Sequence, residues 1–243
     1  MGGSLLMVWL WAPHLEDDPG LIPGYLLVLL LAIVYVSGFS PILIHHDPPV
    51  LRGLGTRRTF FVRTDDLRST LSAYGILAIA GTLVLLGLAL NGDPAAPLRL
   101  LGRAFWLKLA LYLFSALGQQ LFFMGFFFVR LREIFGAYPD TPAKHLVLTR
   151  FLVCGGTALL IAAYHIPNPP MMVIVSIFGF GLAWIFYARP NLLLAVLCHA
   201  WLGTLLHRVV LLPMRVGPFY WMPDRYVYRT LFPFIRQWIG DLF

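Results

Sequence analysis

Runs of about 20 consecutive apolar residues are the feature that most limits what this chain can fold into. A helix of about 20 residues spans the roughly 30 Å hydrocarbon core of a bilayer. Charges inside these runs, such as Lys108 and Arg150, lie near an end, where a long side chain can reach the headgroups. We therefore predict an all-α polytopic membrane helix bundle of about six to eight transmembrane helices. The six clearest runs are Leu21–Leu43, Leu71–Leu90, Ala104–Val129, Leu146–Ile166, Met171–Ala188 and Asn191–Leu212.

The composition agrees with membrane insertion and excludes an ordinary soluble domain. Of the 243 residues, 59% are hydrophobic and only 12% are charged, whereas a soluble domain carries about 25% charged residues. The net charge of +7 comes from 18 Lys and Arg against 11 Asp and Glu. Most of it lies beside the apolar runs, where positive charge orients a membrane protein and attracts anionic lipid. We expect membrane lipid as a partner and no nucleic acid.

Basic loops give an orientation for part of the chain. The 46–70 loop is the most arginine-rich segment, so the positive-inside bias makes it cytoplasmic and places residues 1–20, an expected interfacial stub, outside. The 130–145 loop is then cytoplasmic as well. The C-terminal segment 213–243 is also basic, although six crossings would leave it outside. Either it forms a further interfacial or membrane element, or one predicted span is wrong.

The organisation along the chain indicates one membrane domain over residues 1–243. The connection 167–170 reads Pro-Asn-Pro-Pro, which is long enough only for a tight turn, so the flanking spans should be antiparallel neighbours. Cys154 and Cys198 lie in separate spans and are expected to be packing thiols.

Polar side chains inside the apolar runs are few, and such groups are costly at bilayer depth unless they serve a function. All 11 acidic residues lie outside the runs. The candidates within them are Gln119, Gln120, His165, His199 and His207. Of these, His207 lies near a helix end and is expected at the membrane interface.

Four of these residues fall in three short motifs. The first motif is Gln119-Gln120-x-x-x-Met124-Gly125, the second is Ile161-x-x-x-His165, and the third is His199-x-x-x-Gly203. Their order and spacing resemble those of the CPBP family of CAAX prenyl proteases and bacteriocin-processing proteins, also called Abi. The resemblance covers about residues 115–205 and implies that the helix bundle is CAAX-protease-like. It also implies an intramembrane endopeptidase, in a multi-pass protein that we expect in a bacterial cytoplasmic membrane.

The departures from the family pattern concern the chemistry itself. The family motifs read Glu-Glu-x-x-x-Arg-Gly, Phe-x-x-x-His and His-x-x-x-Asn, and the resemblance implies that the glutamates activate water while the histidines and the asparagine orient it or stabilise an oxyanion. Here Gln119 and Gln120 replace the glutamates, Met124 replaces the arginine and Gly203 replaces the asparagine. A neutral amide cannot accept a proton, so the general base is missing. The joint loss of the glutamates and the arginine removes both halves of a buried charge network.

Three functions remain open on these residues. The first is a pseudoprotease, or a homologue with altered chemistry, that still binds a membrane-tethered peptide or lipidated segment. The second is an active intramembrane endopeptidase that uses His165 and His199. The third is a non-enzymatic scaffold or transporter-like protein, in which the glutamines hold helices together by hydrogen bonds.

The sequence does not require a cofactor. A divalent metal is conceivable within the family, but a zinc site needs three or four converging ligands. No dedicated ligand spacing of that kind occurs here, and the pair His45-His46 is expected to mark a membrane edge.

Overall fold

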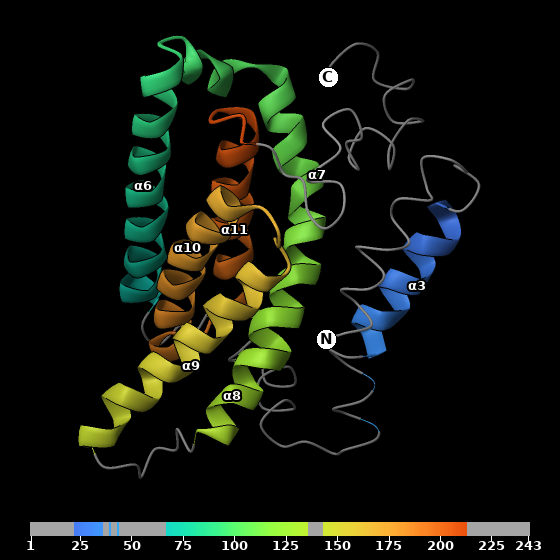
Figure 1. Cartoon of the computed structure of the whole chain (residues 1–243), viewed down its shortest axis with the longest axis vertical. Helices are drawn as coiled ribbons and strands as arrows, with labels where there is room; N and C mark the ends of the chain where they lie inside the picture. The colour runs from blue at the N-terminus through green and yellow to red at the C-terminus, as the bar shows by residue number, and fades with distance from the viewer. Residues whose placement is uncertain (1–21, 36–38, 40–42, 44–66, 136–142, 213–243) are drawn as a thin grey trace.

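The structure, a computed structural model, describes residues 22–35, 39, 43, 67–135 and 143–212 (Figure 1). The N-terminal stub, the pair His45-His46 and the C-terminal segment lie outside the described residues. Within that part there are helices and no strands, so the all-α prediction is confirmed. In chain order the helices are α3 (Ile22–Val34), α6 (Leu67–Gly92), η5 (Ala96–Leu101), α7 (Arg103–Gln120), η6 (Leu121–Phe127), α8 (Phe128–Ile134), α9 (Ala143–Ala163), α10 (Pro169–Ala188) and α11 (Leu192–Arg208).

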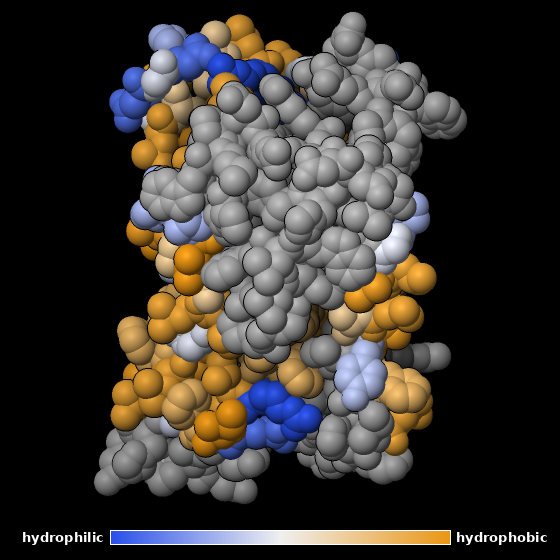
Figure 2. All heavy atoms as spheres, turned by 45° about the vertical axis from the view of Figure 1, so that its right-hand side comes forward, coloured by the Kyte–Doolittle hydropathy of each residue, from blue (hydrophilic) through white to orange (hydrophobic). Residues whose placement is uncertain are grey.

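The lengths of these helices suit a bilayer. Three are long and apolar enough to cross it, namely Leu67–Gly92, Arg103–Ile134 and Pro169–Ala188, and the apolar stretches Val147–Ala163 and Leu192–Arg208 are slightly shorter. Figure 2 shows hydrophobic residues over the middle of the described surface and the most hydrophilic residues toward its two ends. Water or headgroups can therefore reach the charged ends, while the middle suits lipid. The chain is an integral membrane protein.

Two asparagines set the starts of the last two helices. The side-chain oxygen of Asn168 accepts from the backbone N–H of Met171 at 3.2 Å, and that of Asn191 accepts from Leu194 at 2.9 Å. Each bond satisfies one of the N–H groups that the first turn of a helix leaves unpaired. Pro169 occupies the first turn of α10, where its missing N–H costs nothing.

Helices α9 and α10 pack side by side in opposite directions, as the short connection between them predicts. Closer to the connection, Gly179 at the middle of α10 packs against Ala158 of α9, whose Cα would lie 3.6 Å from an added Cβ. Far from it, Arg150 of α9 contacts Trp184 of α10. Small residues such as Gly179 let membrane helices approach closely, so van der Waals contact holds the pair together.

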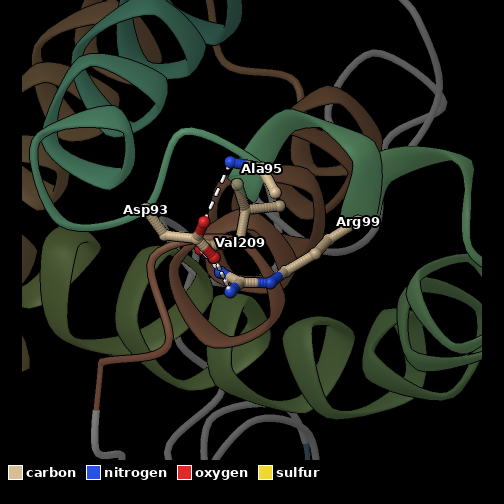
Figure 3. A network of polar contacts seen from close by, with 4 residues as sticks. All are labelled: Asp93, Ala95, Arg99 and Val209. Carbon is tan, nitrogen blue, oxygen red and sulfur yellow. Dashed lines mark hydrogen bonds and ion pairs between the residues drawn. The ribbon is translucent and has the colours of Figure 1, made fainter.

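Helices α7 and α11 are also antiparallel. Where α7 begins and α11 ends, Arg99 makes polar contacts with Asp93 and Val209 (Figure 3). Arg99 of η5 donates from Nη1 to the backbone oxygen of Val209, just after α11, at 2.8 Å. Arg99 also pairs with Asp93, whose other oxygen accepts from the N–H of Ala95 at 2.9 Å. A cation at the C-terminal end of α11 offsets the partial negative charge of the unpaired carbonyls there.

Candidate functional site

The first motif lies where α7 changes into a π-helix. Gln119 and Gln120 are the last two residues of α7, and Met124 and Gly125 lie in η6. The wider turn of a π-helix rotates the side chains that follow it relative to those that precede it, and such segments are frequent at functional sites. Met124 is fully buried in the apolar core.

The two glutamines point in different directions. The amide nitrogen of Gln119 donates to Ser115 Oγ, one turn earlier on the same helix, at 3.0 Å on an exposed face. Gln120 is only 1% exposed and faces α11. The sequence predicts that Gln119, Gln120, His165 and His199 form one polar site. In the structure Gln120 contacts a histidine directly, whereas the Gln119 amide bonds within its own helix.

Gln120, His199 and Tyr112 form a chain of uncharged hydrogen bonds between α7 and α11. Nε2 of Gln120 lies 2.7 Å from Nδ1 of His199, and Nε2 of His199 lies 3.3 Å from the hydroxyl of Tyr112. With the amide donating, Nδ1 accepts and the ring proton on Nε2 is donated to the Tyr112 oxygen. Turning the amide reverses both bonds, so each ring nitrogen of His199 is engaged in either arrangement.

Tyr112 also explains the glycine of the third motif. A Cβ added at Gly203 would lie 3.1 Å from the Tyr112 hydroxyl oxygen and closer still to its ring. The ring therefore occupies the space that an asparagine side chain at this position would need. Sequence reasoning missed Tyr112, although it lies about two turns before Gln120 on the same face of α7. An aromatic hydroxyl in phase with a buried glutamine was the available signal.

His165 lies in the turn that follows α9, close to the same region. Nδ1 of His165 contacts the backbone oxygen of Ile161 at 2.9 Å, and a carbonyl can only accept, so Nδ1 carries the proton and Nε2 presents a lone pair. The neighbouring Tyr164 packs edge-on against Phe123 of η6, with ring centroids 5.3 Å apart. This contact places the turn that carries His165 beside η6, the helix that directly follows Gln120. As whole residues, His165 and His199 are half-buried.

The acidic residues of the described segments are engaged elsewhere. Glu133 pairs with Arg130 at the end of α8 at 2.8 Å, and Asp93 pairs with Arg99 beyond the end of α6. No carboxylate among the described residues therefore contacts the Gln120–His199–Tyr112 chain.

The same residues do not make a metal site. Within the described ranges, no three His, Cys, Asp or Glu side chains converge. His199 uses both ring nitrogens in hydrogen bonds, and the amide of Gln120 is a poor substitute for a carboxylate ligand. The residues present do not fit a divalent cation, so no chemical step is assigned to one. Cys154 and Cys198 are free and buried, as expected for packing thiols.

The similarity to known proteins comes from the same part of the chain. Residues 101–205 match one family model, described as type II CAAX prenyl endopeptidase Rce1-like. The match spans all three motifs and agrees with the resemblance found in residues 115–205. No curated protein and no solved structure matches the chain.

Proposed function

We propose that this membrane protein, whose residues 101–205 match the Rce1-like family model, binds a membrane-tethered peptide or lipidated segment without cleaving it. It is then a pseudoprotease, which we place in a bacterial cytoplasmic membrane. The observation that carries the proposal is the uncharged hydrogen-bonded chain Gln120–His199–Tyr112, two of whose members stand at motif positions that the family resemblance associates with catalysis.

Hydrolysis requires a group that takes a proton from the attacking water. Neither Gln119 nor Gln120 can accept one at any working pH. His199 has no ring nitrogen left over for water while Gln120 and Tyr112 hold it. Losing a general base typically costs about 10²- to 10⁴-fold in rate.

Binding requires only polar groups that a peptide can satisfy, and the site offers them. Oε1 of Gln120 is buried and has no hydrogen-bond partner among the described residues. An unpaired buried acceptor is unfavourable, and an N–H of a bound backbone would satisfy it. The Nε2 lone pair of His165, whose Nδ1 donates to the Ile161 carbonyl, adds a second acceptor near the same place. Polar groups held at bilayer depth without charge suit recognition better than ion transport.

A second candidate, slow hydrolysis, has one observation in its favour. The bond from Nδ1 of His165 to the Ile161 carbonyl fixes the tautomer that leaves Nε2 free to accept a proton. An imidazole oriented in this way can act as a general base. In this scheme water would lose its proton to His165 rather than to a carboxylate.

One experiment separates these candidates. The full chain in lipid vesicles is incubated with a farnesylated peptide that ends in a CAAX sequence and carries a photo-crosslinker on an aliphatic residue. We expect crosslinks to α7 or α11, an intact peptide by mass spectrometry, and weaker crosslinking after Gln120→Leu but not after the matched Gln119→Leu. Cleavage that His165→Ala abolishes would establish the second candidate, and the absence of any crosslink would refute peptide binding.

A further inference from the structure

Helices α8, α9 and α10 come together at one end of the bundle (Figure 1), and two arginines lie there around one aromatic ring. Arg150 of α9 stacks on Trp184 of α10, with its Cζ 3.8 Å from the ring centroid, and its Nη2 donates to the Trp184 backbone oxygen at 2.7 Å. Arg132 of α8 lies over Tyr187, with its Cζ 4.9 Å from that ring centroid. The Cζ of Arg150 is 5.3 Å from the same centroid. Both guanidinium groups therefore border Tyr187.

The charges around this cluster do not balance within the described segments. Glu133 is next to Arg132 in the chain, but its carboxylate pairs with Arg130. Asp93 is engaged with Arg99 at the other end of the bundle. Nε of Arg150 is buried and, among the described residues, has no hydrogen-bond partner. Two cations held beside one ring repel each other unless an anion joins them.

The position of the cluster indicates the kind of anion. Arg132 lies in the last turn of α8, where the candidate span Arg103–Ile134 ends. Trp and Tyr side chains favour this level of the bilayer, where phospholipid headgroups lie. The planar fork of a guanidinium group matches a phosphate better than it matches most other anions. The positive-inside bias assigns this end to the cytoplasmic leaflet, which is rich in anionic lipid.

We propose that Arg132 and Arg150, framed by Trp184 and Tyr187, bind the phosphate of an anionic phospholipid headgroup. The aromatic rings hold the two guanidinium groups in place, so little side-chain freedom is lost when the lipid binds. A free phosphate ion shares this chemistry, and the experiment distinguishes the two sources. The site is independent of the proposed peptide binding, because none of its residues belongs to the three motifs.

The test measures lipid retained by the full-length protein in detergent by native mass spectrometry. Phosphatidylglycerol, phosphatidylcholine and inorganic phosphate are titrated separately. We expect phosphatidylglycerol to bind more tightly than phosphatidylcholine, and Arg132→Gln to weaken it about fivefold, the effect of one charge near a membrane surface. The matched control Arg68→Gln removes the same charge from an exposed position at the start of α6 and should leave the affinity unchanged.

Three results would overturn the proposal. The first is equal affinity for the two lipids, and the second is an equal loss of affinity in Arg132→Gln and Arg68→Gln, which would indicate bulk surface charge. The third is inorganic phosphate that displaces the bound phosphatidylglycerol at similar concentrations. Arg150→Lys keeps the charge but loses the fork and the stacking, so we expect it to weaken phosphatidylglycerol binding as well. Arg132 has no hydrogen bond among the described residues, so its substitution should leave the fold intact.

Discussion

Two polar regions join α7 and its neighbours to α11, and they solve the same problem in different ways. At the end of the bundle, Arg99 links Asp93 to the carbonyl of Val209 through full charges that are about one-third exposed. In the interior, Gln120 and Tyr112 hold His199 through neutral groups. The charged groups lie at the end of the bundle, where contact with solvent lowers the cost of desolvating them. In the interior, where that cost would be high, the contacts are hydrogen bonds between neutral groups.

This difference has a consequence for function. A hydrolytic site of the kind that the family motifs imply would need carboxylates and a compensating cation in the interior, where the protein has amides and Met124 instead. Tyr112 fills the space next to Gly203, so the interior is packed for its neutral state. Four substitutions test the contrast between the two regions, and their expected effects decrease from Met124 through Gly203 and Gln120 to Asp93.

Met124→Arg places a charge in the interior and should be the most damaging change. Met124 is fully buried, and no carboxylate of the described residues lies beside it. An uncompensated buried charge costs about 3–5 kcal/mol, measurable as a loss of unfolding free energy in mixed detergent micelles. Met124→Leu conserves the volume and should cost less than about 1.5 kcal/mol. If Met124→Arg were as stable as Met124→Leu, the interior would contain a group that compensates the added charge, and it would not be neutral.

Gly203→Ala tests the packing of Tyr112. The added Cβ would overlap the Tyr112 ring, and overpacking of this kind typically costs about 1–3 kcal/mol. Gly155→Ala is the matched control, because a Cβ there meets nothing within 4 Å, and it should be neutral or slightly stabilising. Tyr112→Ala should relieve the clash, so the double variant should lose less stability than the two single losses added together.

Gln120→Leu removes the neutral hydrogen bond to His199. Polar contacts between membrane helices contribute about 0.6 kcal/mol on average and at most about 1.7 kcal/mol, so a loss in this range is expected. Gln119→Leu should change the unfolding free energy by less, because its amide bonds to Ser115 on an exposed face. Equal losses in the two variants would mean that the glutamines have similar structural roles.

Asp93→Asn tests the charged end and should have the smallest effect. Exposed ion pairs contribute about 0.2–1 kcal/mol and weaken as salt rises. The variant should therefore approach the parent protein in unfolding free energy at high salt, while the deficit of Gln120→Leu should not respond to salt. Asparagine can still accept from the N–H of Ala95, so a salt-independent loss in Asp93→Asn would contradict a role based on charge.

The sequence predicted the fold better than it predicted the site. The apolar runs correctly predicted α6, α7, α9, α10 and α11, because runs of about 20 apolar residues are typical of helices that cross a bilayer. The sequence could not predict that the side chains of Gln119 and Gln120 point in different directions. Their directions depend on which face of α7 packs against α11 and on the π-helix that follows α7. Tyr112 was missed for the same reason, because its role arises from a contact with Gly203 across two helices.

The stacking of Arg150 on Trp184 shows a further limit. The sequence indicated that the Arg150 guanidinium group lies near a helix end, but not that it stacks on the ring of Trp184 in α10. Contacts between residues far apart in the chain depend on the crossing of α9 and α10. Periodicity and composition do not determine that crossing.

The claim that the Gln120–His199–Tyr112 site binds a peptide without hydrolysing it is tested most directly by a single-turnover assay. The protein is in excess over a prenylated CAAX peptide in ¹⁸O-labelled water. We expect the peptide to stay bound and whole, with no ¹⁸O in any carboxylate. Release of a C-terminal tripeptide together with ¹⁸O incorporation into the new carboxylate, lost on His199→Ala or His165→Ala, would contradict the assignment of a pseudoprotease.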